Sequence, residues 1–556
     1  MKIALAQLNF HIANLSGNRK KMESAISEAL ADKADLIVFS ELSVCGYPPL
    51  DLLEQKDFID ACQAEVEYLA TLSKDIGIVV GAPAINPNAK GKKLFNAAFF
   101  LAEGSIQQRV YKTLLPTYDI FDEYRYFEPN TEFNLVEFKG HRFALTICED
   151  LWDDQPVDNA FARTKLYTRS PMDELSDRDP EFIINISASP FAWNKLSARR
   201  EVMCQNARKY HLPVFYANQV GANTELIFDG ESMVVHPSGS VVDQFNSFEE
   251  EVRIYELENL ILNTKIREEN KYENLLEEKK LEMIYKALIL GIKDYFGKMG
   301  FKKACLGLSG GIDSALTLVL AVEALGAENL HVLLMPSKYS SDHSVDDSVK
   351  LANNLGISFS TIPIQSVVDS FEEQLKDMFK GTSPDITEEN IQARTRGTLL
   401  MALSNKKGHI LLNTSNKSEV AVGYSTLYGD MNGGLSVIGD VYKTDVYRLS
   451  EYVNRHFEVI PDNILRKPPS AELRPDQKDS DSLPDYELLD QILNCYIEKR
   501  MPVSDIVSEG FNEPLVHRIV QLVNRSEYKR FQSPPILRVS SKAFGMGRRI
   551  PLVARY

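Results

Sequence analysis

The chain has 556 residues, a formal net charge of −16 and 44% hydrophobic residues, values typical of a globular protein with two or three domains. The acidic charge argues against broad binding to nucleic acid or to anionic membranes, and no apolar run reaches the length of a membrane span. The six cysteines lie far apart without a CxxC pair, which excludes a disulfide framework or a zinc ribbon and favours a reducing cytoplasm.

Residues 1–262 alternate short apolar runs with helical patterns, which predicts stacked α and β layers with active-site residues at strand ends. The predicted strands cover residues 3–8, 36–39, 76–81, 97–101, 143–147, 182–186 and 214–217. The predicted helices between several of them cover residues 18–31, 58–73 and 195–210.

Three strand-like runs lead directly into a reactive side chain, namely Glu41, Lys112 and Cys148. Each one alone is a weak signal, because a strand-end cysteine is more often a packed apolar residue than a nucleophile. Together they supply a nucleophile in Cys148, a cation in Lys112 that would favour the thiolate and hold an oxyanion, and a proton carrier in Glu41.

Four segments in this order, SELSVCGYPPLDLL, YKTLLPTYDIFDEYRYF, ICEDLW and NISASPF, resemble the nitrilase (carbon–nitrogen hydrolase) superfamily over residues 1 to about 260. The resemblance implies an α-β-β-α sandwich in which Glu41, Lys112 and Cys148 form the catalytic triad. It also implies that Glu123 supports Lys112 in a glutamine-binding site. The other expected glutamine-binding residues are Tyr118, Ser189 and Lys195, although Ser189 could equally cap the turn before Pro190.

Residues 263–280 are strongly charged and are interpreted as a solvated linker to a second domain at 281–556. In that domain short apolar runs again alternate with helical patterns. This alternation predicts a doubly wound parallel sheet with ligands at the carboxyl ends of the strands. The predicted strands cover 302–308, 331–335, 358–364 and 409–412, and the predicted helices cover 283–295, 315–325, 342–355, 367–379 and 389–405.

A glycine-rich turn joins the first of these strands to a helix. Such a turn presents backbone N–H groups and the positive end of the helix dipole to a phosphate. The turn lacks the Gly-Lys-Ser/Thr ending of a Walker loop and does not fit GxGxxG. Its SGGxDS pattern resembles the pyrophosphate loop of the ATP pyrophosphatases. The expected ATP-binding residues of this loop are Gly307, Leu308, Ser309, Gly310, Gly311, Ile312, Asp313 and Ser314.

Further clusters of polar residues in the second domain limit which substrates are expected, although each cluster alone could be ordinary solvent-exposed polar residues. Asn390 and Arg394 lie one turn apart on a predicted helix. A strand end leads into Thr414 and Glu419, and Lys529 lies near the C-terminus. Met335 follows another strand, where it could meet the ATP base or form an ordinary β–α turn.

Together with SGGIDS, these clusters resemble the NAD synthetase family of amidating ATP pyrophosphatases from about residue 281 to the end. The resemblance implies that Thr414 contacts ATP, and that Asp313 and Glu419 hold Mg²⁺ or the dinucleotide. It also implies a deamido-NAD site formed by Asn390, Arg394, Glu419 and Lys529. One departure is the SNKS segment before Glu419, where the shorter, ammonia-only enzymes have an Asp-His pair. Which groups of this segment touch nucleotide is therefore open.

The two halves together imply the final step of NAD biosynthesis, in which ATP activates deamido-NAD as an acyl-adenylate and L-glutamine supplies ammonia through a protected passage. Three alternatives remain: amidation of another acid or nucleotide, a tRNA-modifying ATP pyrophosphatase, and an inactive amidase half that serves as an interaction module. The acidic charge weighs against the RNA enzyme, and the intact Glu41, Lys112 and Cys148 weigh against the inactive half. We expect a cytoplasmic homo-oligomer without a nucleic-acid or membrane partner.

Overall fold

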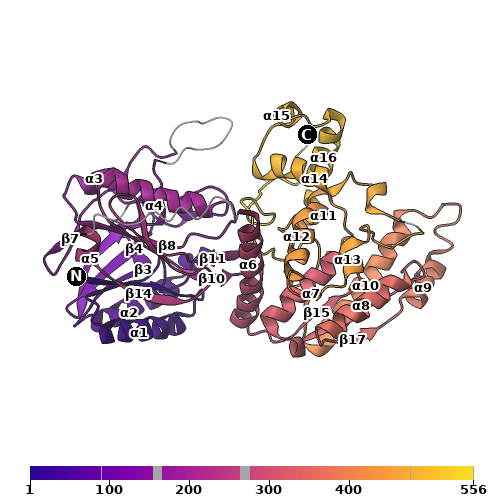
Figure 1. Ribbon diagram of the computed structural model, residues 1–556, viewed down its shortest axis with the longest axis horizontal. Coiled ribbons are helices and arrows are strands. Elements are labelled where there is room, and N and C mark those ends of the chain that lie inside the picture. Colours follow the sequence, from indigo (N-terminus) through magenta and orange to yellow (C-terminus); the bar gives the residue numbers. More distant parts are fainter. Residues whose placement is uncertain (89, 155–165, 263–275, 476, 555–556) are drawn as a thin grey trace. The chain divides into compact units, whose positions relative to one another are not determined.

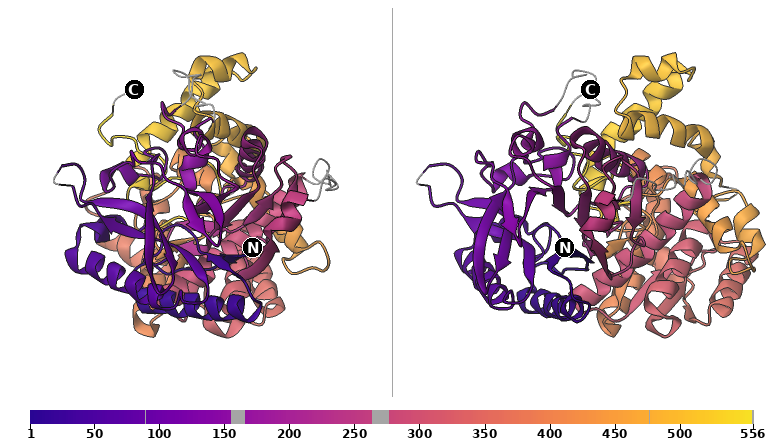
Figure 2. Two further views of the ribbon diagram at one scale, coloured as in Figure 1. Left: turned by 90° about the vertical axis from the view of Figure 1, so that its left-hand side faces the viewer. Right: turned by 60° about the vertical axis from the view of Figure 1, so that its left-hand side comes forward.

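The computed structural model describes residues 1–88, 90–154, 166–262, 276–475 and 477–554. The chain divides into two compact units, Met1–Asn274 and Leu275–Tyr556 (Figures 1 and 2). Most of the predicted linker, residues 263–275, lies outside the described residues, whereas residues 276–280 belong to helix α6 rather than to a linker. None of the described helices is both long and apolar enough to cross a membrane.

The first unit contains two six-stranded sheets, in the orders β14-β1-β2-β3-β4-β5 and β13-β12-β9-β8-β7-β6. A separate hairpin pairs β10 with β11. The first sheet consists of β1 (Lys2–Gln7), β2 (Leu36–Val38), β3 (Gly77–Ile85), β4 (Leu94–Ala102), β5 (Ser105–Tyr111) and β14 (Glu251–Glu256). The second consists of β6 (Val136–Phe138), β7 (His141–Ile147), β8 (Phe182–Ser187), β9 (Val214–Asn218), β12 (Met233–Val235) and β13 (Val241–Gln244), and the hairpin of β10 (Val220–Asn223) and β11 (Leu226–Asp229).

The inner faces of the two sheets form one apolar core. Phe100 of the first sheet meets Phe143 of the second edge to face, with ring centroids 6.0 Å apart. Helices α1 (Leu15–Ala31) and α2 (Lys56–Thr71) lie along one side of the unit, and α3 (Pro171–Ser176) and α4 (Leu196–Tyr210) along the other (Figure 1). The short helix α5 (Leu257–Leu262) follows β14. The predicted α-β-β-α sandwich is confirmed.

The second unit is built on a five-stranded parallel sheet in the order β17-β16-β15-β18-β19, which confirms the predicted parallel sheet. Its strands are β15 (Ala304–Gly307), β16 (Leu330–Leu334), β17 (Ser358–Thr361), β18 (Ile410–Asn413) and β19 (Leu435–Ser436). The helices that surround and extend the sheet are α6 (Leu276–Met299), α7 (Ile312–Leu325), α8 (Asp342–Asn354), α9 (Gln365–Leu375), α10 (Ile386–Lys407), α11 (Lys417–Val422) and α12 (Lys443–Val453). They are followed by α13 (Asp462–Arg466), α14 (Tyr486–Leu493), α15 (Val503–Ser508), α16 (Glu513–Arg525) and α17 (Glu527–Arg530).

Local signals fix the ends of the helices that carry candidate site residues. Helix α10 begins with a reciprocal capping box between Asp385 and Glu388, and it ends at Gly408 in the left-handed conformation. Helix α11 begins at Asn416, whose side chain accepts a hydrogen bond from the backbone of Glu419. Because α11 follows β18, its N-terminus lies beyond the carboxyl end of that strand.

Candidate active sites

Lys112 is the centre of a buried charge cluster in the first unit. Its Nζ donates to Oε1 of Glu41 at 2.7 Å and to Oε1 of Glu123 at 2.8 Å, and its side chain has no exposed surface. Burial alone would lower the pKa of Lys112, but the charges of Glu123 and Glu41 raise it well above its ordinary value. Lys112 is therefore a fixed cation at neutral pH.

Both carboxylates of this cluster are held from several directions. Glu41 also accepts from the amide of Asn96 at 2.7 Å and from the backbone N–H of Ala188 at 3.0 Å. Glu123 accepts from the phenol of Tyr47 at 2.9 Å, and burial raises its pKa in spite of the neighbouring cation. Because each acceptor has fixed partners, the Lys112 ammonium is locked in place.

Cys148 stands at the first residue after β7 in a strained turn. Its φ of 47° is uncommon for a residue with a side chain, and such strain collects at functional sites. The side chain is 6% exposed. Burial raises the pKa of the thiol well above its ordinary value, the charge of Glu41 raises it further, and Lys112 lowers it. The structure thus brings Cys148 within the electrostatic reach of Glu41 and Lys112, with the thiol protonated at rest.

Next to Cys148, the carboxylate of Glu149 accepts from the phenols of Tyr118 and Tyr167, each at 2.8 Å. Burial raises the pKa of Glu149, while the two phenols and the charge of Lys195 lower it. Sequence reasoning missed Glu149 and Tyr167, although the ICEDLW motif contains Glu149. The backbone N–H of Ser189 donates to Oδ1 of Asn218 at 2.9 Å, which leaves both interpretations of Ser189 open.

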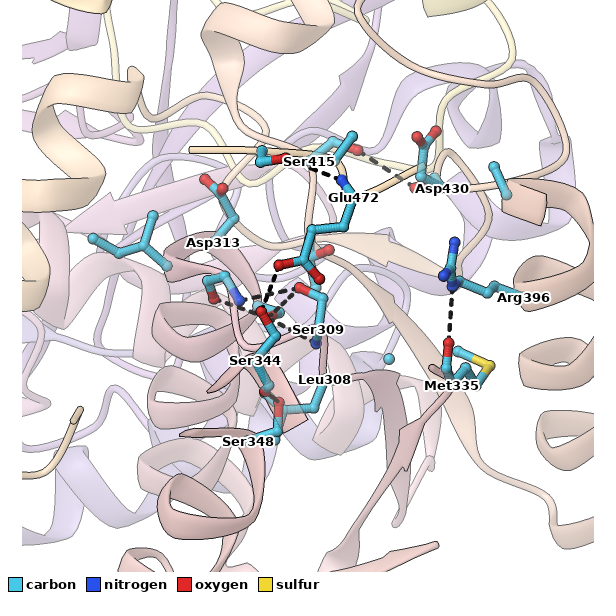
Figure 3. A pocket seen from close by; sticks show the side chains of 18 of the residues that line it. Leu308, Ser309, Asp313, Met335, Ser344, Ser348, Arg396, Ser415, Asp430 and Glu472 are labelled. Carbon is cyan, nitrogen blue, oxygen red and sulfur yellow. Dashed lines mark hydrogen bonds between the residues drawn. The ribbon is translucent and has the colours of Figure 1, made fainter. Parts of the chain in front are cut away.

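In the second unit, a cavity of about 320 Å³ lies at the carboxyl ends of β15, β16 and β18. Most of the predicted phosphate loop lines it, as does Met335 (Figure 3). Thr414 lines it too. Gly310 is the one residue of this loop that does not line the cavity, and its φ is 75°. A Cβ on it would lie 2.3 Å from the carbonyl oxygen of Ser344, so this position requires glycine.

Asp313 and Glu419 are brought together by a lysine that sequence reasoning missed. The Nζ of Lys443 forms an ion pair with Oδ2 of Asp313 and lies 3.2 Å from Oε1 of Glu419. The amide of Asn416 donates to Oδ1 of Asp313 at 2.9 Å. Burial raises the pKa of Glu419, Lys443 lowers it and Asp313 raises it. Within the described ranges, no group of three or more His, Cys, Asp or Glu side chains could hold a metal ion.

The SNKS segment divides its contacts between the cavity and the protein interior. Ser415 lines the cavity, and Asn416 reaches Asp313. Lys417 instead is fully buried, and its Nζ lies 2.9 Å from both Asp440 and Glu498. Ser418 is buried as well. Of this segment, Ser415 alone lines the cavity, and Asn416 acts from the interior through Asp313.

Three of the residues expected to bind deamido-NAD converge on the loop 423–428, although the cavity lining does not include them. Asn390 accepts from the hydroxyl of Thr426 at 2.7 Å. Arg394 donates from Nε to the carbonyl of Leu427 at 3.2 Å, and Lys529 donates to the carbonyl of Ser425 at 2.7 Å. The structure thus gathers the three side chains around one loop.

Two further cations line the cavity, and the sequence assigned a role to neither of them. Arg396 donates from Nε to the carbonyl of Met335 at 3.1 Å, and burial lowers the pKa of its guanidinium to about 10 (Figure 3). Lys467 donates to the hydroxyl of Ser344 at 2.9 Å, and burial lowers its pKa too. The same hydroxyl donates to Glu472 at 2.7 Å. Desolvated cations beside a glycine-rich loop suit an anionic ligand.

Comparisons with known proteins divide the chain in the same way. Residues 2–265 match the carbon-nitrogen hydrolase family, and residues 284–533 match the NAD synthase family. The glutamine-dependent NAD(+) synthetase of Synechocystis sp. is 44% identical and the one of Thermotoga maritima 41% identical, each alignment covering 100% of this chain and 99% of the relative.

Solved structures give the same result. The glutamine-dependent NAD+ synthetase of Acinetobacter baumannii, solved in complex with adenosine diphosphate, is 37% identical and superposes with a TM-score of 0.75. The alignment covers 99% of this chain and 98% of that one. The enzyme of Cytophaga hutchinsonii, at 20% identity and a TM-score of 0.82 over 100% of this chain and 98% of its own, shares the fold.

Proposed function

The chain belongs to the glutamine-dependent NAD(+) synthetases, and we propose that its first unit releases ammonia from L-glutamine while its second unit uses that ammonia and ATP to convert deamido-NAD to NAD. The observation that carries this proposal is the presence of two different reactive sites in one chain. The first centres on Lys112 and Cys148, and the second is the cavity over the phosphate loop.

In the proposed amidase step, Glu41 takes the Sγ proton of Cys148, and the thiolate attacks the carboxamide carbon of glutamine. Lys112 and the backbone N–H of Glu149 stabilise the oxyanion. Glu41 then passes the proton to the departing ammonia and activates the water that hydrolyses the thioester. The raised pKa of the Cys148 thiol supports this order, because a thiol that is protonated at rest needs a neighbouring base.

We assign glutamine recognition to the surroundings of Glu149, with Tyr118, Ser189 and Lys195 as substrate contacts and Glu123 as the support of Lys112. Two observations favour this placement. Tyr118 donates directly to the carboxylate beside the nucleophile, and the charge of Lys195 acts on the same carboxylate.

In the proposed ligase step, the nicotinate carboxylate of deamido-NAD attacks the α-phosphorus of ATP, and pyrophosphate leaves into the loop formed by residues 307–314. The resulting acyl-adenylate has AMP as its leaving group, so ammonia can attack the acyl carbon and form the carboxamide of NAD. The common cavity of the loop, Met335 and Thr414 supports an ATP site here. We place deamido-NAD at the loop 423–428, where Asn390, Arg394 and Lys529 converge.

We propose Mg²⁺ as the metal of the ligase step, with Asp313 and Glu419 as its protein ligands. The donor set fits, because both carboxylates already share one cation, the Lys443 ammonium, and carboxylate oxygens are preferred ligands of Mg²⁺. Bound there, Mg²⁺ would offset the negative charge that develops on the leaving pyrophosphate. Asn416 orients one of the two ligands through its hydrogen bond to Asp313.

We also propose a cytoplasmic homo-oligomer that binds no nucleic acid. The six cysteines are all free thiols, as expected in a reducing compartment. The net charge of −16 disfavours a polyanionic partner. Size-exclusion chromatography with light scattering tests the oligomer, and filter binding with tRNA at low salt tests the absence of a nucleic-acid partner.

The deciding experiment compares Cys148→Ala with the unchanged chain on two nitrogen sources. We expect Cys148→Ala to lose NAD synthesis from glutamine and to keep synthesis from added ammonium. Asp313→Ala should lose both, because it removes a group of the ligase step. Equal losses of both activities in Cys148→Ala would contradict the proposed division of labour. Mass detection of the acid consumed with ATP and glutamine would reveal a different acceptor.

A further inference from the structure

Asp150 is a buried carboxylate that neither reaction step uses. It lies two residues after Cys148 and is 2% exposed. Its Oδ1 accepts from the backbone N–H groups of Thr113 at 3.0 Å and Leu114 at 2.9 Å. Its Oδ2 accepts from the backbone N–H of Ile147 at 3.1 Å. One side chain therefore satisfies three main-chain donors inside the unit.

These donors are the immediate neighbours of two reactive side chains. Thr113 and Leu114 follow Lys112, which comes after β5 of the first sheet. Ile147 precedes Cys148 and ends β7 of the second sheet. Asp150 thus ties the two sheets together at the point where the cation and the nucleophile leave their strands.

Between the strands themselves the inner faces of the two sheets meet through apolar side chains, as in the edge-to-face pair of Phe100 and Phe143, while the backbone N–H of Ala188 also donates to Glu41 at the strand ends. Apolar packing is non-directional, so it keeps the sheets together without fixing how their ends align. Charge-assisted hydrogen bonds are directional and strong. The bonds of Asp150 therefore add a directional link next to Lys112 and Cys148 that apolar packing alone does not supply.

The three donors require a carboxylate. Both of its oxygens accept, whereas an amide has one accepting oxygen and a donating NH₂ group. In an Asp150→Asn chain, the NH₂ group would face either Ile147 N–H or the pair of N–H groups after Lys112. Burial raises the pKa of Asp150 to about 7, while the three backbone N–H groups and the charge of Lys112 lower it, so the accepting carboxylate form prevails above pH 7.

We propose that Asp150 is a positioning residue of the amidase reaction, which sets the placement of Lys112 relative to Cys148 by holding the main chain next to each. It touches neither substrate nor the reacting atoms. The inference rests on the proposed amidase function of the first unit. It predicts that removing the carboxylate of Asp150 disturbs the placement of Lys112 relative to Cys148, while the ligase activity of the second unit is kept.

The test uses the full chain with Asp150→Asn, and Glu181→Gln as the matched control. Glu181 is also a carboxylate that accepts a backbone N–H, from Arg142 at 3.0 Å, but it does so at the opposite end of β7. We expect kcat of glutamine hydrolysis to fall about 100-fold in Asp150→Asn, the cost of a displacement of about 1 Å, with KM within threefold of the unchanged chain. Glu181→Gln should hydrolyse glutamine at the rate of the unchanged chain. Both variants should keep the rate of NAD synthesis from ammonium.

The rate of Cys148 alkylation by iodoacetamide at pH 9 separates positioning from general loosening. Mass spectrometry identifies the alkylated cysteine, and Cys148→Ala provides the blank. Positioning predicts slower alkylation, because the thiolate loses its nearby cation, whereas a loosened fold would expose the thiol and speed alkylation. If Asp150→Asn fails to fold, Asp150→Glu replaces it. That variant keeps the charge but is one methylene longer, and we expect at least a tenfold loss of kcat.

Unchanged hydrolysis in either Asp150 variant, or faster alkylation in Asp150→Asn, would overturn the inference. Absence of glutamine-driven NAD synthesis in the unchanged chain would overturn the proposed function instead. The two failures are therefore distinguishable.

Discussion

A side chain on residue 310 would collide with the carbonyl oxygen of Ser344, which lies 2.3 Å from the position of its Cβ. The phosphate loop therefore rests directly on the first turn of α8. Its contact is backbone against backbone, which leaves neither partner a flexible side chain that could move aside.

We expect Gly310→Ala to abolish NAD synthesis from both nitrogen sources and to leave glutamine hydrolysis intact. The added methyl group must push the loop away from α8, and it also strains a φ of 75°. Gly356→Ala is the matched control, since Gly356 has a φ of 67° with nothing within 4 Å of its Cβ position. That variant should lose about 1–2 kcal/mol of stability and keep both activities. Equal activities in the two variants would show that the contact does not matter.

Lys443→Met should move the pH dependence of the ligase to more alkaline pH. The Lys443 charge lowers the pKa of Glu419, so its loss lets burial and Asp313 raise that pKa further. A protonated Glu419 is a poor metal ligand, and the active fraction at pH 7 therefore falls. The measurement is kcat/KM for ATP against pH, which reports groups of the free enzyme. Lys350→Met, at an exposed ion pair with Glu458, should leave the curve in place.

Arg396→Gln should raise the KM for ATP at least tenfold, because a hydrogen bond to a charged group contributes about 1.5–3 kcal/mol. The guanidinium is desolvated at the cavity wall, where its Nε is already used by Met335. Arg394→Gln is the comparison, since Arg394 contacts the loop 423–428 and should mainly raise the KM for deamido-NAD. Steady-state kinetics with each substrate varied in turn measure both KM values. A raised KM for deamido-NAD in Arg396→Gln and for ATP in Arg394→Gln would contradict the prediction.

Alkylation of Cys148 in the resting enzyme should still accelerate above pH 9, because burial holds the pKa of its thiol well above the ordinary value. The charge of Glu41 raises the same pKa. Cys148 in the Glu41→Gln variant should therefore be alkylated faster at any given pH, even though the variant loses glutamine hydrolysis. Stopped-time iodoacetamide labelling across pH 7–10 measures both effects. A rate that levels off near pH 7 would contradict them.

The sequence predicts the architecture well, because that information is local. Buried strands, helical patterns and the glycine-rich turn each lie within a short window, and the sandwich and the parallel sheet are confirmed. Strand β13 was missed, since it is half-buried along its whole length and shows no clear alternation of buried and exposed residues. The predicted roles of Glu41, Lys112, Cys148 and the phosphate loop stay predictions until variants are measured.

What the sequence could not supply is the set of long-range partners. Lys443 meets Asp313 across 130 positions of chain, and Asn416 meets it across 103. Nothing in the surroundings of Lys443 marks it, because lysines on helices are commonly solvated. The partners of Asp150 could not be predicted either. Its position in ICEDLW is visible in the sequence, but the hydrogen bond that it accepts from Thr113 depends on how the two sheets pack.

The ammonium of Lys443 lies between Asp313 and Glu419 and is an internal counter-ion for both carboxylates of the ligase site. Two neighbouring carboxylates would otherwise repel each other and drift apart. The ion pairs of Lys443 thus hold the two carboxylates together without a metal. With Mg²⁺ on Asp313 and Glu419, the same ammonium would supply a positive charge beside the phosphates.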